Sequence, residues 1–173
     1  MFNATRHDAA ALSMSYTPSN SVFEDLIGPT LLQTAQQKRV CTVAAVDFAD
    51  IIGLYFAAWN KPCRAFTQKL KTAYNNGEES VRRTMEIVFV SIESDEAAFQ
   101  DCFAEMPWFA VPLGGHGIQK KLARQFEVTE TPCFILLDSK TGDVVSKNGV
   151  APEKEQISKF KNPLLEFSSL SSI

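Results

Sequence analysis

Residues 51–63 read Ile51-Ile52-Gly53-Leu54-Tyr55-Phe56-Ala57-Ala58-Trp59-Asn60-Lys61-Pro62-Cys63. The apolar run that begins at Ile51 is typical of a central β-strand buried on both of its faces. After Pro62, apolar side chains recur with helical spacing up to a turn signal near Asn75, so we expect a helix over residues 62–75. The segment therefore predicts a buried strand that leads directly into a helix, with Cys63 in the first turn of that helix.

A cysteine at the start of a helix points to thiol chemistry, because the unpaired N–H groups of the first turn favour a thiolate. Enzymes that exchange thiols and disulfides normally place two cysteines there, separated by two residues. The first thiolate attacks the substrate disulfide, and the second cysteine then releases the mixed disulfide. Here the first position is Asn60, and only the second, Cys63, carries sulfur. A dithiol mechanism is therefore excluded at residues 60–63, and Cys63 is the candidate thiol.

Asn60 has two interpretations, and the sequence leaves both open. Asn is among the best N-cap residues, because its side-chain oxygen accepts a hydrogen bond from an N–H of the first turn and contributes about 1 kcal/mol to helix stability. With Asn60 as the N-cap, Cys63 is the third residue of the helix, and the site is redox-silent. In the alternative interpretation, Asn60 takes part in chemistry beside Cys63.

The remaining pattern predicts an α/β fold. A short helix and a lead-in strand are expected within residues 23–32, and residues 106–117 form a loop rich in Pro and Gly. The other expected elements are strands at 42–46, 86–92, 133–137 and 143–146 and helices at 95–104, 118–126 and 153–161. This order predicts a central mixed sheet with helices on both faces, in one domain over residues 21–165. We expect a flexible N-terminal extension at residues 1–20 and a flexible Ser-rich tail at 166–173.

Composition and charge narrow the range of partners. A net charge of −3, with basic residues scattered along the chain, argues against binding to nucleic acid or to a membrane surface. No apolar run approaches the roughly 18 residues of a membrane-spanning helix, and the N-terminus lacks the pattern of a secretion signal. We therefore expect a cytoplasmic protein.

The cysteines do not predict a metal centre. The chain has four of them, Cys41, Cys63, Cys102 and Cys133, and they lack the paired spacing of a zinc site. We therefore expect no metal and no cofactor. In a reducing compartment, Cys41 and Cys102 are expected to be small buried apolar residues.

Three motifs carry a resemblance to a known family. The first runs from Gly53 to Thr67 and contains Trp59 and Pro62-Cys63. The second runs from Phe103 to Pro112 and contains Met106-Pro107-Trp108. The third runs from Phe126 to Asp138, contains Thr131-Pro132-Cys133, and continues at Thr141–Val145. Taken together, the sequence resembles the tryparedoxin and nucleoredoxin branch of the thioredoxin superfamily, which implies a thioredoxin-like fold.

The resemblance also implies roles for individual residues. It places Asn60 at the position of the nucleophilic cysteine and Cys63 at the second, resolving cysteine. It implies a cis peptide bond at Thr131-Pro132, where the backbone would bind an extended substrate. The groove implied in this way is lined by Trp59, Lys61, Pro62, Thr131 and Pro132. Leu54 stands where many thioredoxins have a buried carboxylate, so the resemblance supplies no general base.

Two functions remain open at this point. In the first, the protein is a redox-inactive or weakly active binding module that holds a protein or peptide in the groove of Trp59 and Thr131-Pro132. In the second, it is a thiol–disulfide oxidoreductase or a thiol sensor that acts through Cys63 alone. A low-molecular-weight thiol such as trypanothione or glutathione would then be its partner.

Two further hypotheses concern residues near this groove. In the family's fold the cis-proline loop packs beside the active-site helix, so Cys133 is a candidate second thiol that pairs with Cys63. Trp108 has two interpretations, as a side chain of the surface groove and as a packing residue.

Overall fold

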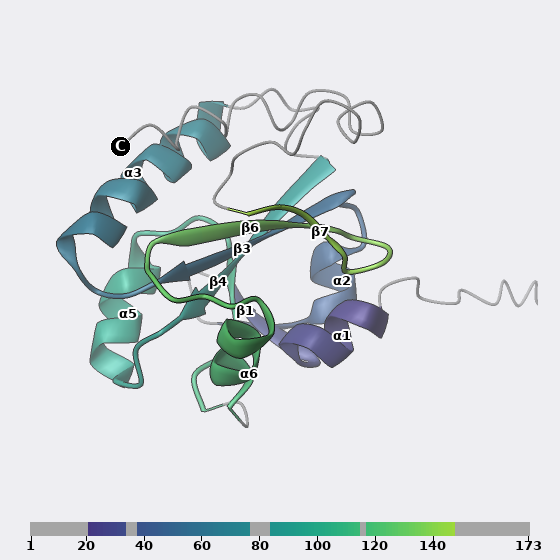
Figure 1. The fold of residues 1–173 in the computed structure, drawn as a ribbon, viewed down its shortest axis with the longest axis horizontal. Helices are drawn as coiled ribbons and strands as arrows, with labels where there is room; N and C mark the ends of the chain where they lie inside the picture. Colours follow the sequence, from purple (N-terminus) through teal and green to yellow (C-terminus); the bar gives the residue numbers. More distant parts are fainter. Residues whose placement is uncertain (1–20, 34–37, 77–83, 115–116, 148–173) are drawn as a thin grey trace, which may run out of the picture.

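The computed structural model describes residues 21–33, 38–76, 84–114 and 117–147. The expectations for residues 1–20, 153–161 and 166–173 lie outside these ranges. Within them, the protein is an α/β fold built on a mixed sheet whose strand order is β2-β1-β5-β4-β3-β6-β7 (Figure 1). The expected fold class is therefore confirmed.

The strands have the following bounds: β1 (Thr30–Gln33), β2 (Lys38–Cys41), β3 (Ile51–Ala57), β4 (Met85–Ser91), β5 (Phe109–Ala110), β6 (Cys133–Asp138) and β7 (Val144–Lys147). Every residue of β3 is buried, as its apolar run predicts. This strand pairs in parallel with β4 and antiparallel with β6, so it is an interior strand of the sheet.

The helices cover both faces of this sheet. Their bounds are α1 (Ser21–Ile27), α2 (Thr42–Val46), α3 (Lys61–Asn76), α5 (Glu96–Ala104) and α6 (Ile118–Gln125). The first core cluster lies between one face of the sheet and the helices α3 and α5, and it contains Tyr55, Cys63 and Phe89. The second cluster lies under α1, α2 and α6, and it contains Leu54, Phe56 and Cys133. Alternation along β3 sends neighbouring side chains to these two clusters in turn.

The segment 42–46 corrects one prediction, because it is the helix α2 and not a strand. Thr42 is buried, its N–H donates to the carbonyl oxygen of Pro29 at 3.0 Å, and its hydroxyl donates to that of Gly28. Thr42 and Val46, four residues apart, bury the same face of the helix. These contacts outweigh the strand preference of the β-branched residues.

Two strands were missed by the sequence pattern. β2 pairs with β1 at the edge of the sheet, and its exposed Lys38 and Arg39 hide it from an apolar pattern. β5 lies inside the predicted loop and has only two residues, which pair with Leu32 and with β4. Cys41 closes β2 and is exposed, so its predicted burial is wrong, whereas Cys102 is buried as expected. Among the described residues, no helix is long and apolar enough to cross a membrane.

Candidate functional site

The site begins where β3 ends and α3 starts. The backbone N–H of Cys63 donates to the side-chain Oδ1 of Asn60 at 2.9 Å, and the N–H of Arg64 donates to the backbone oxygen of Asn60 at 3.0 Å. Asn60 is therefore the N-cap of α3, in the geometry expected of an Asn at this position. Its side chain takes up one of the N–H groups that a helix leaves unpaired in its first turn.

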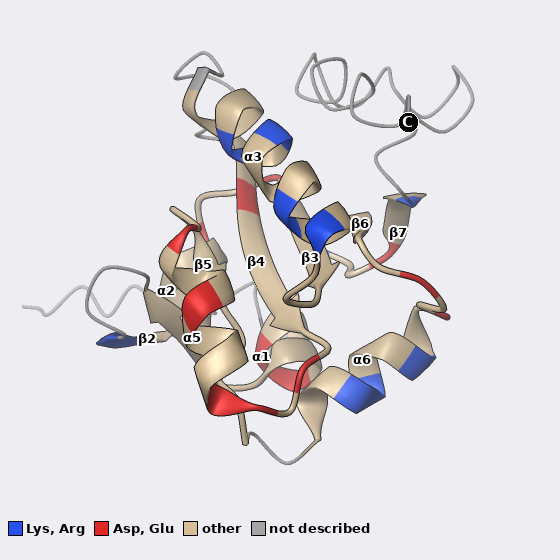
Figure 2. Cartoon of the chain, turned by 90° about the vertical axis from the view of Figure 1, so that its left-hand side faces the viewer, with Lys and Arg blue, Asp and Glu red and all other residues tan. Residues whose placement is uncertain are grey.

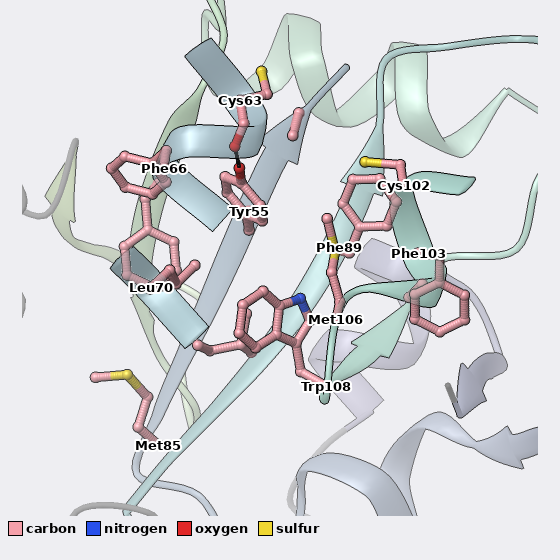
Figure 3. Close-up of a cluster of buried hydrophobic side chains, with 14 of the residues drawn as sticks. Tyr55, Cys63, Phe66, Leu70, Met85, Phe89, Cys102, Phe103, Met106 and Trp108 are labelled. Atoms are coloured by element: carbon pink, nitrogen blue, oxygen red, sulfur yellow. Dashed lines mark hydrogen bonds between the residues drawn. The ribbon is translucent and has the colours of Figure 1, made fainter. Parts of the chain in front are cut away.

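Cys63 faces the core instead of solvent. Its side chain is 1% exposed, and its Sγ accepts a hydrogen bond from the N–H of Ala58 at 3.4 Å. Figure 3 shows the residue above the ring of Tyr55, at the end of the first core cluster. The sulfur is thus shielded from solvent at the junction of β3 and α3.

A buried hydroxyl pair supports the first turn of α3 from below. The carbonyl oxygen of Cys63 accepts a hydrogen bond from the Tyr55 hydroxyl at 3.1 Å (Figure 3). It also accepts one from the Thr67 hydroxyl at 2.9 Å. The two hydroxyls are 2.9 Å apart. Burial raises the pKa of Tyr55, so its hydroxyl stays protonated. The sequence pattern missed this pair, although a tyrosine within an otherwise apolar strand is a signal that a polar partner is nearby.

Trp59 is held from two sides and remains partly exposed. Its backbone N–H donates to Oε1 of Glu93, which follows β4, at 3.3 Å. The guanidinium carbon of Arg64 lies 5.0 Å from the centre of the indole ring, within the range of a cation–π contact. Lys61 and Pro62, next to it on α3, are exposed. Charge at this edge is mixed, since α3 carries only basic charged residues while acidic ones gather near α5 (Figure 2).

Thr131 and Pro132 lie at the same edge of the sheet. Cys133, the first residue of β6, pairs with Phe56 near the end of β3. Because these strands are antiparallel, the residues that precede β6 and those that follow β3 meet at one edge. The Thr131–Pro132 bond is cis, and both side chains are partly exposed. The strand register therefore places the predicted groove residues at the same end of the sheet.

Cys133 does not join this site. Its side chain belongs to the second core cluster, whereas Cys63 belongs to the first, on the opposite face of the sheet. Within the described residues, neither of the two forms a disulfide. Burial raises the pKa of the Cys133 thiol, and the nearby ammonium of Lys147 opposes that rise. The structure therefore does not bring together the predicted Cys63–Cys133 pair.

Cys102 is the other buried thiol of the first cluster. Burial raises the pKa of this thiol to about 12. It is therefore a protonated thiol near neutral pH, which is the unreactive form.

Trp108 is a packing residue and not part of the groove. It is 2% exposed, and its ring lies 6.2 Å from that of Tyr55 and 5.6 Å from that of Tyr74, edge-on in both cases. Within the described ranges, His, Cys, Asp and Glu side chains form no group of three or more that is suited to a metal ion.

Comparison with known proteins identifies the family of this chain. A family model described as thioredoxin-like matches residues 49–144, which include the strand β3, the start of α3 and the Thr131–Pro132 bond. The chain belongs to the thioredoxin superfamily, in its tryparedoxin and nucleoredoxin branch.

Relatives and solved structures extend this family assignment. The protein is 34% identical over 127 residues to nucleoredoxin of Xenopus laevis, a match that covers 73% of this chain and 29% of the relative. It is 44% identical over 100 residues to probable nucleoredoxin 1 of Arabidopsis thaliana, covering 57% of this chain and 17% of the relative. This thioredoxin-like chain thus spans less than a third of the length of either nucleoredoxin. The structure of native tryparedoxin I from Crithidia fasciculata matches with a TM-score of 0.63 and 28% identity, over 83% of this chain and 92% of that one.

Proposed function

We propose that this thioredoxin-like protein is a binding module without dithiol chemistry, which holds an extended segment of a partner protein along Trp59 and Thr131–Pro132. The observation that carries the proposal is the hydrogen bond from the Cys63 N–H to Asn60 Oδ1, at 2.9 Å. In a dithiol enzyme of this family, a thiolate at position 60 would be the attacking group and would be stabilised by this helix start. Here an amide oxygen occupies the place, and it has no redox chemistry.

The burial of Cys63 supports the same conclusion. A thiolate must approach the substrate disulfide directly to exchange with it. With 1% of its side chain exposed and its Sγ bonded to the N–H of Ala58, Cys63 offers no path for such an approach unless the start of α3 opens. The single sulfur at this site therefore acts as core packing.

The surroundings of Asn60 supply the binding surface. Trp59 offers part of an aromatic ring, and its position is set by Glu93 and Arg64. At the same end of the sheet, the backbone that precedes β6 lies outside the sheet ladder, which begins only at Cys133. Backbone of this kind recognises an extended peptide through main-chain hydrogen bonds, and side chains such as Trp59 add apolar contact.

The binding proposal is tested with peptides that contain no cysteine, so that a mixed disulfide cannot contribute. We would screen an array of peptides of about ten residues, long enough to span roughly 30 Å when extended. Trp59→Ala and Pro132→Ala should each weaken binding of the selected peptides by about tenfold or more, equivalent to the roughly 1.4 kcal/mol of a modest hot spot. Phe48→Ala is the matched control, because Phe48 is 84% exposed and precedes the other end of β3.

The competing function, catalysis or sensing through Cys63 with a low-molecular-weight thiol, gives a different result. Peptides without cysteine would then not bind. Incubation with oxidised glutathione would transfer one glutathionyl group to native Cys63, as a mixed disulfide, and release one molecule of reduced glutathione. Either of these outcomes would overturn the binding proposal.

A further inference from the structure

The segment that carries Thr131 and Pro132 is short, so its position depends on how its two ends are held. On one side, α6 ends at Gln125, and the N–H of Val128 still donates to Ala123 at 2.8 Å. On the other side, β6 begins at Cys133. Thr129 and Glu130 between them are exposed. The place of this groove wall is therefore set by how firmly the turn after α6 is held relative to β6.

Lys147 connects these two ends. Its Nζ donates to the carbonyl oxygen of Phe126 at 2.9 Å and to that of Glu127 at 3.3 Å, and its backbone pairs with Ile135 of β6. The last carbonyl groups of a helix lack partners within the helix, and a cation is favourable beside them. One side chain from the edge strand β7 thus joins the turn after α6 to the strand pair β6–β7.

Two observations describe the surroundings of this contact, one on the backbone of Glu127 and one on the distance of Lys147 from β6. Glu127 has a φ of 51°, in the left-handed region that residues with side chains seldom adopt. Such a conformation persists only when its surroundings hold it. The ammonium of Lys147 also lies close enough to Cys133 to oppose the rise in pKa of that thiol, so it is near the residue that follows Pro132.

We infer that Lys147 is a positioning residue of the peptide groove, whose ammonium ties the turn after α6 to β6 and thereby holds Thr131 and Pro132 beside Trp59. Its effect on peptide affinity rests on the proposed function. Its effect on the order of residues 128–132 needs no ligand and can be measured separately.

The first measurement is hydrogen exchange of the full chain, read on fragments that contain residues 128–132. Lys147→Met keeps the length of the side chain and removes the donor, and we expect exchange in these fragments to be about tenfold faster, since a hydrogen bond from a charged group is lost. Lys147→Arg should restore the wild-type rate. Lys140→Met is the matched control, because Lys140 is an exposed lysine in the turn between β6 and β7. Fragments from β4 report global opening.

The second measurement is the affinity of these variants for a peptide selected by the wild-type protein. Lys147→Met should weaken it by about tenfold, with recovery in Lys147→Arg and no change in Lys140→Met. Unchanged exchange at residues 128–132, equally faster exchange in β4, or faster local exchange with unchanged affinity would each overturn the inference. If no peptide binds the wild-type protein, the proposed function fails, and the exchange data alone then decide whether Lys147 orders the segment.

Discussion

The side-chain Oδ1 of Asn60 accepts a hydrogen bond from the backbone N–H of Cys63 at 2.9 Å. Positions 60 and 63, which carry the two cysteines of the family's redox motif, are thus joined by a hydrogen bond and not by a disulfide. This bond gives α3 the cap that any helix start needs. The N–H of Cys63 in the first turn of α3 thus has a hydrogen-bond acceptor although no thiolate is present. The fold at this site is therefore preserved without the attacking sulfur.

Asn60→Cys should create a Cys-Lys-Pro-Cys site and measurable reduction of insulin disulfides, because it adds a thiol at the exposed start of α3. Adding Cys63→Ser to this variant should abolish turnover and trap a mixed disulfide, since the resolving thiol is then missing. A folded Asn60→Cys variant without activity would show that the groove, or the absence of a carboxylate at Leu54, also prevents catalysis.

Asn60→Ala should lower the free energy of unfolding by about 1 kcal/mol through loss of the N-cap. Asn60→Asp is the matched control, because its carboxylate accepts the same N–H and should retain wild-type stability. Urea unfolding at neutral pH measures both variants. Equal stability of Asn60→Ala and the wild type would mean that the cap contributes nothing to α3.

Native alkylation should separate the four cysteines by their burial. Cys41 is exposed and should react first, whereas Cys63, Cys102 and Cys133 are buried and should react at least about tenfold more slowly, by way of opening of the structure. Peptide mass spectrometry without and with denaturant reads all four sites in one sample. Rapid labelling of Cys63 in the native protein would favour the thiol function and contradict its role as core packing.

Deprotonation of the Glu86 carboxyl should lower the free energy of unfolding as the pH rises from about 4.5 to 7. Burial raises the pKa of this carboxyl to about 7, while its hydrogen bonds with the Ile87 N–H and the Tyr74 side chain oppose the rise. The folded state therefore binds the proton more tightly than the unfolded state, and folding loses up to about 3 kcal/mol across this range. Above the folded pKa the loss is complete.

Glu86→Gln tests that pH dependence. Urea unfolding between about pH 4.5 and 8 should show a flatter profile in this variant and a higher stability than the wild type at the alkaline end. Tyr74→Phe removes a hydrogen bond that lowers the pKa, so the midpoint of the wild-type transition should move to higher pH. A wild-type profile that rises through this range would contradict the assignment to Glu86.

The sequence predicted the centre of the fold well, for a local reason. The run from Ile51 is buried on both faces because β3 has a strand on either side and a core cluster above and below it, which requires apolar residues at every position. The cap of α3 is also a local property, because Asn60 lies three residues before Cys63. Asp95 follows the same rule, and its side chain accepts the N–H of Ala98 at 2.8 Å at the start of α5.

The wrong predictions from the sequence share one cause, which is contacts between residues distant in the chain. Residues 42–46 have strand composition, yet the bonds of Thr42 to Gly28 and Pro29, distant in sequence, place them in a helix. The exposure of Cys41 follows from the position of β2 at the edge of the sheet, which no local pattern reveals. The separation of Cys63 from Cys133 depends on which face of β6 the latter occupies, and that is set by the register with β3.

The sequence by itself therefore determined the fold family, the strand–helix junction and the absence of a second sulfur at residues 60–63, because motif and capping chemistry act between near neighbours. Only the tertiary structure decided that Cys63 is covered, that Tyr55 and Thr67 support its carbonyl, and that Lys147 reaches the turn after α6. The physical reason is that burial and side-chain hydrogen bonds are set by residues that folding brings together from distant parts of the chain.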